Sequence, residues 1–227
     1  MRNKLEYALI FDLDGTLVDN SRYHQLAWCE FSRKYKNNLT AEDFLKIFGT
    51  TNKYHLEYIL KRNIDDDELY SLAEEKEAIY RNLINDEFIA IEGLNDFLNT
   101  VKTKKIRTAL ATSAPKSNVD FSLEKLNLQN FFDVIIYDGM VKKGKPDPEI
   151  FITASQKLNI KNELCVVFED SIFGVKAAKA ASMIVVALTT SHSPKQLEGA
   201  DLYIKNFNEI SITKIEKLLR KNVNRKK

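Results

Sequence analysis

The side chains with the clearest chemical potential are Asp12 and Asp14, two carboxylates in the string DLDGTLVD at residues 12–19. They follow a short, mostly apolar run at residues 5–11, which is typical of a buried strand in a parallel sheet. Two carboxylates this close repel, so one of them tends to hold a proton or to recruit a cation. The pair therefore indicates one ionised nucleophile or metal ligand and one general acid or base. A turn in which aspartates cap backbone amides has the same pattern.

Three later groups of polar side chains also stand where apolar runs end. Thr112 and Ser113 follow one such run, and hydroxyls with backbone amides at a helix start can hold an anion such as phosphate. Lys145 lies in the lysine-rich string KKGKPDP, and Glu169 and Asp170 follow another apolar run. Each group alone has an ordinary explanation as a helix cap or a solvated loop. Together they outline a phosphoryl-transfer site with a nucleophile, a divalent cation, a cationic clamp and hydrogen-bond donors.

The elements that must position these groups alternate between strand and helix. After the first strand we expect strands at residues 106–112, 134–137, 164–168, 184–188 and 201–204, with helices at residues 93–103, 117–126, 148–158, 171–181 and 212–219. Strands separated by single helices form right-handed crossovers, so the fold class is α/β with a doubly wound, Rossmann-like, mostly parallel sheet. Such sheets bind ligands beyond the carboxyl ends of their strands, which is where the polar groups fall.

A helical stretch interrupts this alternation. Four helices are expected between residues 21 and 87, and Thr40 with Asp43 is typical of the start of the second. We therefore predict an α/β core made of residues 1–19 and 91–227, with residues 20–90 inserted as a small helical bundle.

Composition limits the alternatives. The 227 residues carry a formal net charge of +2, which gives no reason to expect a nucleic-acid partner. Cys29 and Cys165 lie far apart, and neither a membrane-spanning stretch nor a signal region is evident, so we expect a cytoplasmic protein without a membrane partner. We also expect a monomer. The basic residues 220–227 are expected to form a frayed tail after the last helix.

The order and content of these motifs resemble the haloacid dehalogenase superfamily over essentially the whole chain. The strings KPDPEIF at residues 145–151 and EDS at residues 169–171, with Gly174 nearby, are similar to the branch that contains β-phosphoglucomutase and related sugar phosphatases. The resemblance implies that the helical insertion is a cap that closes over the substrate and excludes water.

The resemblance also implies a catalytic role for four residues. Asp12 would attack phosphorus to give an aspartyl-phosphate. Asp14 would protonate the leaving oxygen and then activate water. Thr112 and Lys145 would hold the phosphoryl oxygens, and Lys145 would also offset the charge of Asp12.

A metal site follows from the same resemblance. Its ligands would be Asp12, the backbone carbonyl of Asp14 and the carboxylate of Asp170, with Glu169 beside the metal or acting through water. Ligation by oxygen alone, together with phosphate chemistry, favours Mg2+ over zinc.

Six further residues are expected to contact the substrate: His24, Gly49, Asn52, Lys76, Ser113 and Asn118. His24 and Lys76 fall where this branch carries a histidine and a lysine that face the site. Locally, they also read as a helix-face histidine and a surface lysine with helical ion pairs. Asn52 stands where β-phosphoglucomutase carries an arginine that clamps the phosphate that is not transferred.

We therefore expect an enzyme, a phosphatase for a small phosphorylated metabolite such as a sugar or polyol phosphate. The alternative is a mutase of the β-phosphoglucomutase type, which must grip a bisphosphate at both ends and would lose a bidentate contact at Asn52. A dehalogenase would need no metal, and the retained Asp14 and Glu169–Asp170 pair argue against it. A non-catalytic binding protein on this scaffold is expected to lack a nucleophile or metal ligand, and none is missing.

Overall fold

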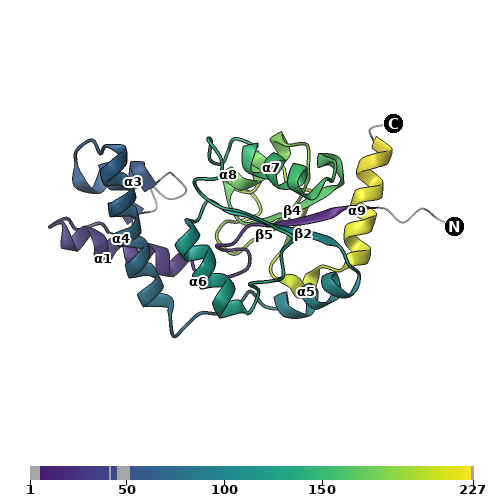
Figure 1. Ribbon diagram of the computed structural model, residues 1–227, viewed down its shortest axis with the longest axis horizontal. Coiled ribbons are helices and arrows are strands. Elements are labelled where there is room, and N and C mark those ends of the chain that lie inside the picture. The colour runs from purple at the N-terminus through teal and green to yellow at the C-terminus, as the bar shows by residue number, and fades with distance from the viewer. Residues whose placement is uncertain (1–5, 41, 45–51, 226–227) are drawn as a thin grey trace. The chain divides into compact units, whose positions relative to one another are not determined.

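The computed structural model describes residues 6–40, 42–44 and 52–225 (Figure 1). The chain divides into two compact units. One unit runs up to Asp19 and resumes at Ile89, and the other comprises Asn20–Phe88. Backbone hydrogen bonds connect the two segments of the first unit. Asp19 N donates to Ile89 O (3.4 Å), and Ile91 N donates to Leu17 O (2.9 Å).

The first unit is built on a six-stranded parallel sheet. Its strands are β1 (Ala8–Phe11), β2 (Arg107–Ala111), β3 (Val134–Ile136), β4 (Cys165–Glu169), β5 (Ile184–Leu188) and β6 (Leu202–Ile204). Their spatial order is β3-β2-β1-β4-β5-β6, so the direction of winding reverses between β1 and β4. Phe11 at the end of β1 lies opposite Leu110 on β2 and Phe168 on β4. A doubly wound sheet binds its ligand at this reversal, beyond the carboxyl ends of the two strands.

Helices cover both faces of this sheet. They are α5 (Leu94–Thr103), α6 (Lys116–Leu126), α7 (Glu149–Leu158), α8 (Ile172–Ala180) and α9 (Ile212–Arg225), with short 3-10 helices η1 (Asn162–Leu164) and η2 (Phe207–Glu209). Figure 1 shows α7 and α8 on one side of the strands and α5 on the other. The expected doubly wound α/β fold is therefore confirmed.

Side chains that alternate along the strands form a core on each face. Ala8 and Ile10 of β1 join the buried cluster under α7 and α8, which includes Phe151 and Val175. The next residue, Phe11, points to the other face. There it stacks on Phe168, with ring centroids 4.8 Å apart, in a group completed by Phe97 of α5 and Phe207 of η2. A strand buried on both faces is continuously apolar, which is why the sequence shows runs rather than alternation.

The second unit is helical in its described part. Its helices are α1 (Ser21–Lys34), α3 (Asn52–Leu60) and α4 (Asp66–Ile84), and residues 42–44 form a helical turn. Thr40 accepts from Asp43 N (3.1 Å), and Asp43 accepts from Thr40 N (3.3 Å), which is the expected reciprocal cap. Asp65 caps α4 by accepting from Glu68 N (2.8 Å). Trp28, Phe31, Leu56, Ile59 and Leu72 form the core of this unit.

The C-terminal helix is longer than expected. The expected end at residue 219 is wrong, and so is the expected frayed tail as far as residue 225, because α9 continues to Arg225; residues 226–227 lie outside the described residues. Leu219 is fully buried, and the side chain of Asn222, one turn further on, donates to the carbonyl of Glu163 (3.4 Å). This contact with η1 stabilises the helix beyond residue 219, where the basic composition had suggested a frayed end.

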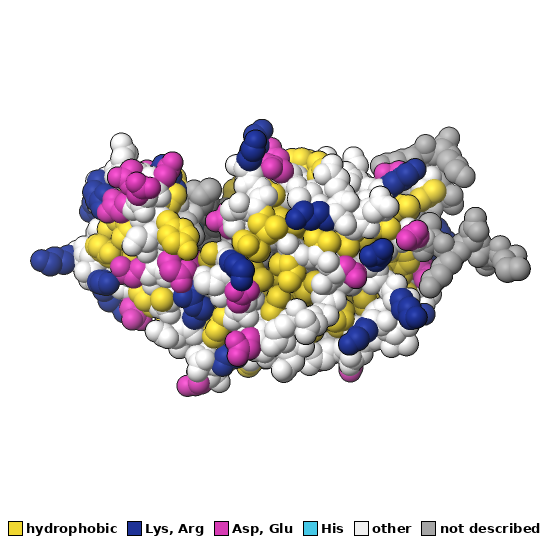
Figure 2. Space-filling view, viewed as in Figure 1, with side chains coloured by type: hydrophobic (Ala, Val, Ile, Leu, Met, Phe, Trp, Pro, Cys, Tyr) yellow, Lys and Arg dark blue, Asp and Glu magenta, His cyan; other side chains and the backbone are white. Residues whose placement is uncertain are grey.

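The surface of the first unit carries both signs of charge. On the face in Figure 2, Lys and Arg side chains are interspersed with Asp and Glu over this unit. No helix in the described ranges combines the length and apolar character needed to span a bilayer.

We predict that Phe207→Ala lowers the free energy of unfolding by about 3–5 kcal/mol. Phe207 is 2% exposed and packs on Phe168 and Phe97, so truncation leaves a cavity beneath the strands that carry the polar groups. Urea denaturation measures the change, with Ile89→Ala (66% exposed) as the control, which should change stability by less than about 1 kcal/mol. A loss below about 1 kcal/mol at Phe207 would contradict this packing.

Candidate active site

Asp12 leaves β1 at the reversal of the sheet. Its backbone N–H donates to Phe168 O (3.0 Å), so it continues the ladder with β4, and its side chain is buried. The chain then turns, with Leu17 N donating to Leu13 O (2.8 Å). Gly15 in this turn has a φ of +70°, and a Cβ there would lie 2.0 Å from Asp170 Oδ2. The turn therefore needs glycine both for its backbone conformation and for its approach to Asp170.

Lys145 joins the ends of two strands. Its Nζ lies 2.7 Å from Asp12 Oδ1 and 2.6 Å from Glu169 Oε1, and its side chain is 8% exposed. The segment that delivers Lys145 is held by Glu149 at the start of α7. The carboxylate of Glu149 accepts from the backbone N–H groups of Lys142 (3.0 Å) and Lys143 (2.9 Å). The lysine-rich string is therefore not a solvated loop at Lys145.

Glu169 is tied to the start of α8. Its Oε2 accepts from Asp170 N (2.9 Å), Ser171 N (2.8 Å) and Ser171 Oγ (2.9 Å), while Ser171 Oγ caps the helix by accepting from Gly174 N (3.0 Å). A Cβ on Gly174 would lie 1.8 Å from Glu169 Oε1, so this helix has room for the carboxylate only with glycine there. Glu169 is fully buried and uses one oxygen for the backbone and the other for Lys145.

Three buried carboxylates form a site that fits a hard divalent cation. Asp12, Glu169 and Asp170 each offer an oxygen, and these oxygens lie within 4.8 Å of one another. Three acids face one lysine, so the group has an excess of negative charge that a cation would offset. Oxygen donors without nitrogen or sulfur suit Mg2+ rather than zinc.

The protonation of these groups reflects the same excess of charge. Burial raises the pKa of Asp12 to about 7, although the charge of Lys145 opposes this shift and those of Glu169 and Asp14 add to it. Burial also raises the pKa of Asp170 well above its usual range, and the charges of Glu169 and Asp12 contribute. Burial lowers the pKa of Lys145, but Asp12 and Glu169 outweigh it and raise that pKa above its usual value. Lys145 is therefore charged at neutral pH.

The remaining residues expected in the first unit lie at neighbouring strand and helix ends. Asp14 is half-buried in the turn after Asp12. Thr112 directly follows β2, is 1% exposed, and accepts from Ala114 N through its hydroxyl (3.1 Å). Ser113 is exposed, whereas Asn118 is buried in the first turn of α6.

The expected residues of the second unit divide into two groups. His24 and Lys76 are brought together, with Lys76 Nζ 2.9 Å from His24 Nδ1 and 2.9 Å from Glu77 Oε1. Lys76 is 2% exposed and lies over the Trp28 ring, so its reading as an ordinary surface lysine is wrong. Asn52, the first residue of α3, is half-buried, and Gly49 lies outside the described residues.

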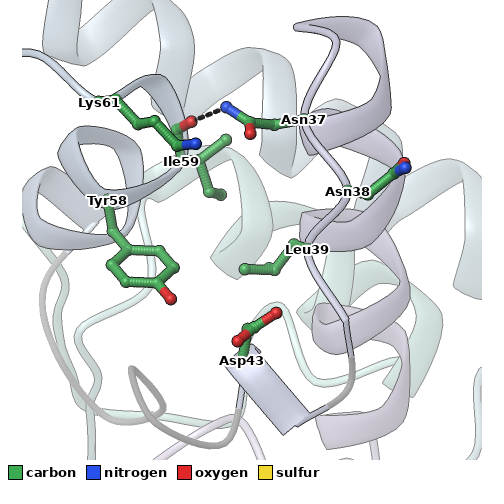
Figure 3. Close-up of a pocket in the computed structure, with 7 residues that line it drawn as sticks. All are labelled: Asn37, Asn38, Leu39, Asp43, Tyr58, Ile59 and Lys61. Atoms are coloured by element: carbon green, nitrogen blue, oxygen red, sulfur yellow. Dashed lines mark hydrogen bonds between the residues drawn. The ribbon is translucent and has the colours of Figure 1, made fainter.

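A cavity of about 400 Å³ in the second unit is lined by none of the expected site residues that the structure describes (Figure 3). Its lining residues are Asn37, Asn38, Leu39, Asp43, Tyr58, Ile59 and Lys61. The Asn37 side chain bridges its two walls by donating to the carbonyl of Ile59, as Figure 3 shows. Among the lining residues that the structure describes, Asp43 is the one acid, so this lining holds no acidic cluster comparable to that at Asp12.

The loop after β5 also contacts the site, although none of its residues was expected there from the sequence. Thr190 Oγ1 donates to Gly15 O (2.6 Å), Ser191 forms a side-chain hydrogen bond with the Asp170 carboxylate, and His192 Nδ1 lies 3.0 Å from Asp170 O. The available signal was the string TTSHS directly after the apolar run that forms β5, another set of polar residues at a strand end.

The comparisons with known proteins agree with this geometry. The family model described as haloacid dehalogenase-like hydrolase matches residues 9–188. A phosphorylated carbohydrates phosphatase of Thermotoga maritima is 34% identical over 180 residues, which are 78% of this chain and 82% of that protein.

Two solved structures are similar to this chain over most of its length. A haloacid dehalogenase hydrolase of family IA, variant 3, from Entamoeba histolytica superposes with a TM-score of 0.89 at 32% identity, covering 95% of this chain and 100% of that one. A β-phosphoglucomutase of Clostridium difficile superposes with a TM-score of 0.83 at 27% identity, covering 96% of this chain and 99% of that one.

We predict that Lys145→Met lowers the free energy of unfolding by about 3–5 kcal/mol near neutral pH, because it leaves buried carboxylates without their counter-charge. The carboxyl pKa of Asp12 is already raised to about 7 in the wild type, and losing the lysine raises it further. A group whose folded-state pKa is raised loses its stabilising contribution as pH rises through that value. The deficit of the variant should therefore grow between about pH 5.5 and pH 8.5.

Chemical denaturation of the metal-free protein across this pH range measures the effect. Lys143→Met is the matched control. It removes a lysine from the same segment, but the Lys143 side chain is 72% exposed, with its Nζ 3.6 Å from Asp147 Oδ2. Its change should stay within about 1 kcal/mol at every pH. A Lys145→Met deficit that is independent of pH would contradict the assigned contacts.

Proposed function

The chain belongs to the haloacid dehalogenase-like hydrolases, and we propose that it is a Mg2+-dependent phosphatase of a small sugar or polyol phosphate. It is an enzyme of the class that hydrolyses phosphate monoesters. The observation that carries the proposal is the buried contact of Lys145 with Asp12 and Glu169, beside Asp170. The Thermotoga maritima relative, a phosphatase of phosphorylated carbohydrates, supports the substrate class.

Asp12 is the proposed nucleophile. A carboxylate oxygen of Asp12 attacks phosphorus, the bond from phosphorus to the ester oxygen breaks, and the leaving oxygen takes a proton from Asp14. Water then attacks the aspartyl-phosphate at phosphorus and gives its proton to Asp14, which releases phosphate and restores both acids. Asp14 is half-buried two residues from Asp12, a position that allows contact with the leaving group and with water.

Lys145 and Thr112 are the proposed phosphate-binding side chains. A dianionic phosphate must approach an acidic cluster, and the charge of Lys145, 2.7 Å from Asp12 Oδ1, reduces that repulsion. The Thr112 hydroxyl can donate to a phosphoryl oxygen while it accepts from Ala114 N. The N–H groups at the start of α6 add the partial positive charge of a helix N-terminus.

Asp12, Asp170 and the backbone carbonyl of Asp14 are the proposed holders of Mg2+. When bound, the ion would supply neutralisation of negative charge at the phosphoryl group. Glu169 takes an indirect part in this proposal, because its oxygens accept from Lys145 and from the start of α8. It fixes the direction of Lys145 and the backbone that carries Asp170.

A β-phosphoglucomutase-type mutase is the second candidate, favoured by the similarity to the Clostridium difficile enzyme. A mutase binds a bisphosphate at both ends, and a neutral amide at Asn52 gives a weaker phosphate contact than a bidentate arginine. We therefore rank hydrolysis first.

A cytoplasmic monomer belongs to the same proposal, and two cysteines without a disulfide fit a reducing compartment.

The first prediction from this proposal concerns Mg2+ and Asp170. Saturating Mg2+, at about 100 times its dissociation constant, should stabilise the wild type by about 2.7 kcal/mol, or about 5–10 °C in Tm. Asp170→Asn should abolish this shift. The variant should also raise the Tm of the metal-free protein, because it removes one of three crowded buried charges.

Differential scanning calorimetry with and without Mg2+ measures both effects. Asp96→Asn, an exposed position on α5, is the matched control and should keep the wild-type shift. If Asp170→Asn responds to Mg2+ as the wild type does, the ion binds elsewhere.

The second prediction separates hydrolysis from isomerisation. With Mg2+, the protein should release inorganic phosphate from sugar or polyol monophosphates. It should isomerise β-glucose 1-phosphate more slowly than it hydrolyses its best substrate, with or without glucose 1,6-bisphosphate. Phosphate release and coupled detection of glucose 6-phosphate measure the two rates. Isomerisation well above the hydrolytic rate would make the protein a mutase. Absence of both isomerisation and phosphate release, with every monophosphate tested, would contradict both readings.

A further inference from the structure

We propose that the loop Thr190–His192 is a positioning element that holds Asp170 and the Gly15 turn in place and thereby sets the affinity for Mg2+. The inference rests on the proposed function, because it assumes that Asp12 and Asp170 hold the ion. It assigns a role to a fifth strand end that neither the motifs nor the comparisons indicate.

Three hydrogen bonds connect this loop to the acidic cluster. Thr190 Oγ1 donates to the carbonyl of Gly15 (2.6 Å), and the Ser191 hydroxyl bonds the Asp170 carboxylate. His192, with a proton on Nδ1, donates to the backbone carbonyl of Asp170 (3.0 Å). The loop therefore holds Asp170 by both its side chain and its backbone, and holds the turn that follows Asp12 and Asp14.

The loop is itself anchored on both sides. It begins at the end of β5, where Ala187 pairs with Glu169 of β4, so it emerges beside the strand that carries the acids. Thr189 N donates to Ile204 O of β6 (2.9 Å), and Ser193 closes the far side through Gln196 Oε1, which accepts from its N (3.1 Å) and Oγ (2.8 Å). A segment fixed at both ends can hold another group in one orientation.

The crowding at Gly15 shows why Asp170 needs such a support. A Cβ on Gly15 would lie 2.0 Å from Asp170 Oδ2 and 2.9 Å from Ser191 Oγ, so the turn, the carboxylate and the hydroxyl meet at one point. Asp170 is also repelled by Asp12 and Glu169. A hydrogen-bond donor that faces a repelled carboxylate keeps it from rotating away, which is the usual role of groups just outside a metal site.

The test is Mg2+ binding by isothermal titration calorimetry, which does not depend on catalysis. Ser191→Ala should weaken Mg2+ affinity roughly tenfold or more, as is typical for loss of such a partner. Ser191→Thr keeps the hydroxyl and should stay within about threefold of the wild type. Ser193→Ala is the matched control, because Ser193 bonds Gln196 in the same loop, and its affinity should not change. At saturating Mg2+, the kcat of Ser191→Ala should approach that of the wild type.

The inference is overturned if folded Ser191→Ala binds Mg2+ as the wild type does. It is also overturned if Ser191→Thr is as weak as Ser191→Ala, since loop packing rather than the hydroxyl would then matter. If Ser191→Ala does not fold, Thr190→Val decides in its place, with the same expected weakening through loss of the bond to Gly15 O. A wild type that binds no Mg2+ would instead remove the proposed metal site on which the inference rests.

Discussion

The buried contact of one lysine with two carboxylates is the interaction on which the site depends. Lys145 contacts Asp12, directly after β1, and Glu169, at the end of the neighbouring strand β4, at the point where the winding of the sheet reverses. Burial raises the pKa of Asp12, and the charge of Lys145 limits that rise. Glu169 also accepts from the backbone N–H groups of Asp170 and Ser171, so the same carboxylate connects Lys145 to the segment that carries Asp170.

Much of the α/β unit could be predicted from sequence because its signals are local. Strands buried on both faces leave apolar runs, and polar residues at their ends meet at one edge of a parallel sheet, so Asp12 and Asp170 could be placed near each other. Lys145 lies nine residues beyond the end of β3, and its place beside Asp12 followed from the family motif rather than from a strand end. The burial of Lys76 could not be predicted from the sequence, because it depends on contacts with Trp28 and His24 of another helix. The continuation of α9 depends likewise on a distant contact, that of Asn222 with Glu163.

The residues that hold the acids in place are the part of the site that sequence motifs reveal least. The helix cap at Ser171, the space at Gly174 and the loop after β5 involve small or hydroxyl-bearing residues, which are common at turns everywhere. Their meaning appears only when the backbone brings them against a carboxylate. The acids and the lysine set the chemistry, whereas these neighbours decide how firmly the acids are held.

The most direct test of the central claim is to look for the phosphoryl group on Asp12. The protein is mixed with Mg2+ and an activated monoester such as p-nitrophenyl phosphate, quenched in acid during turnover and digested for peptide mass spectrometry. We expect one phosphoryl group on the peptide that contains Asp12, and none in Asp12→Asn treated in the same way. Turnover with no phosphorylated peptide, or with the group on another residue, would contradict the account.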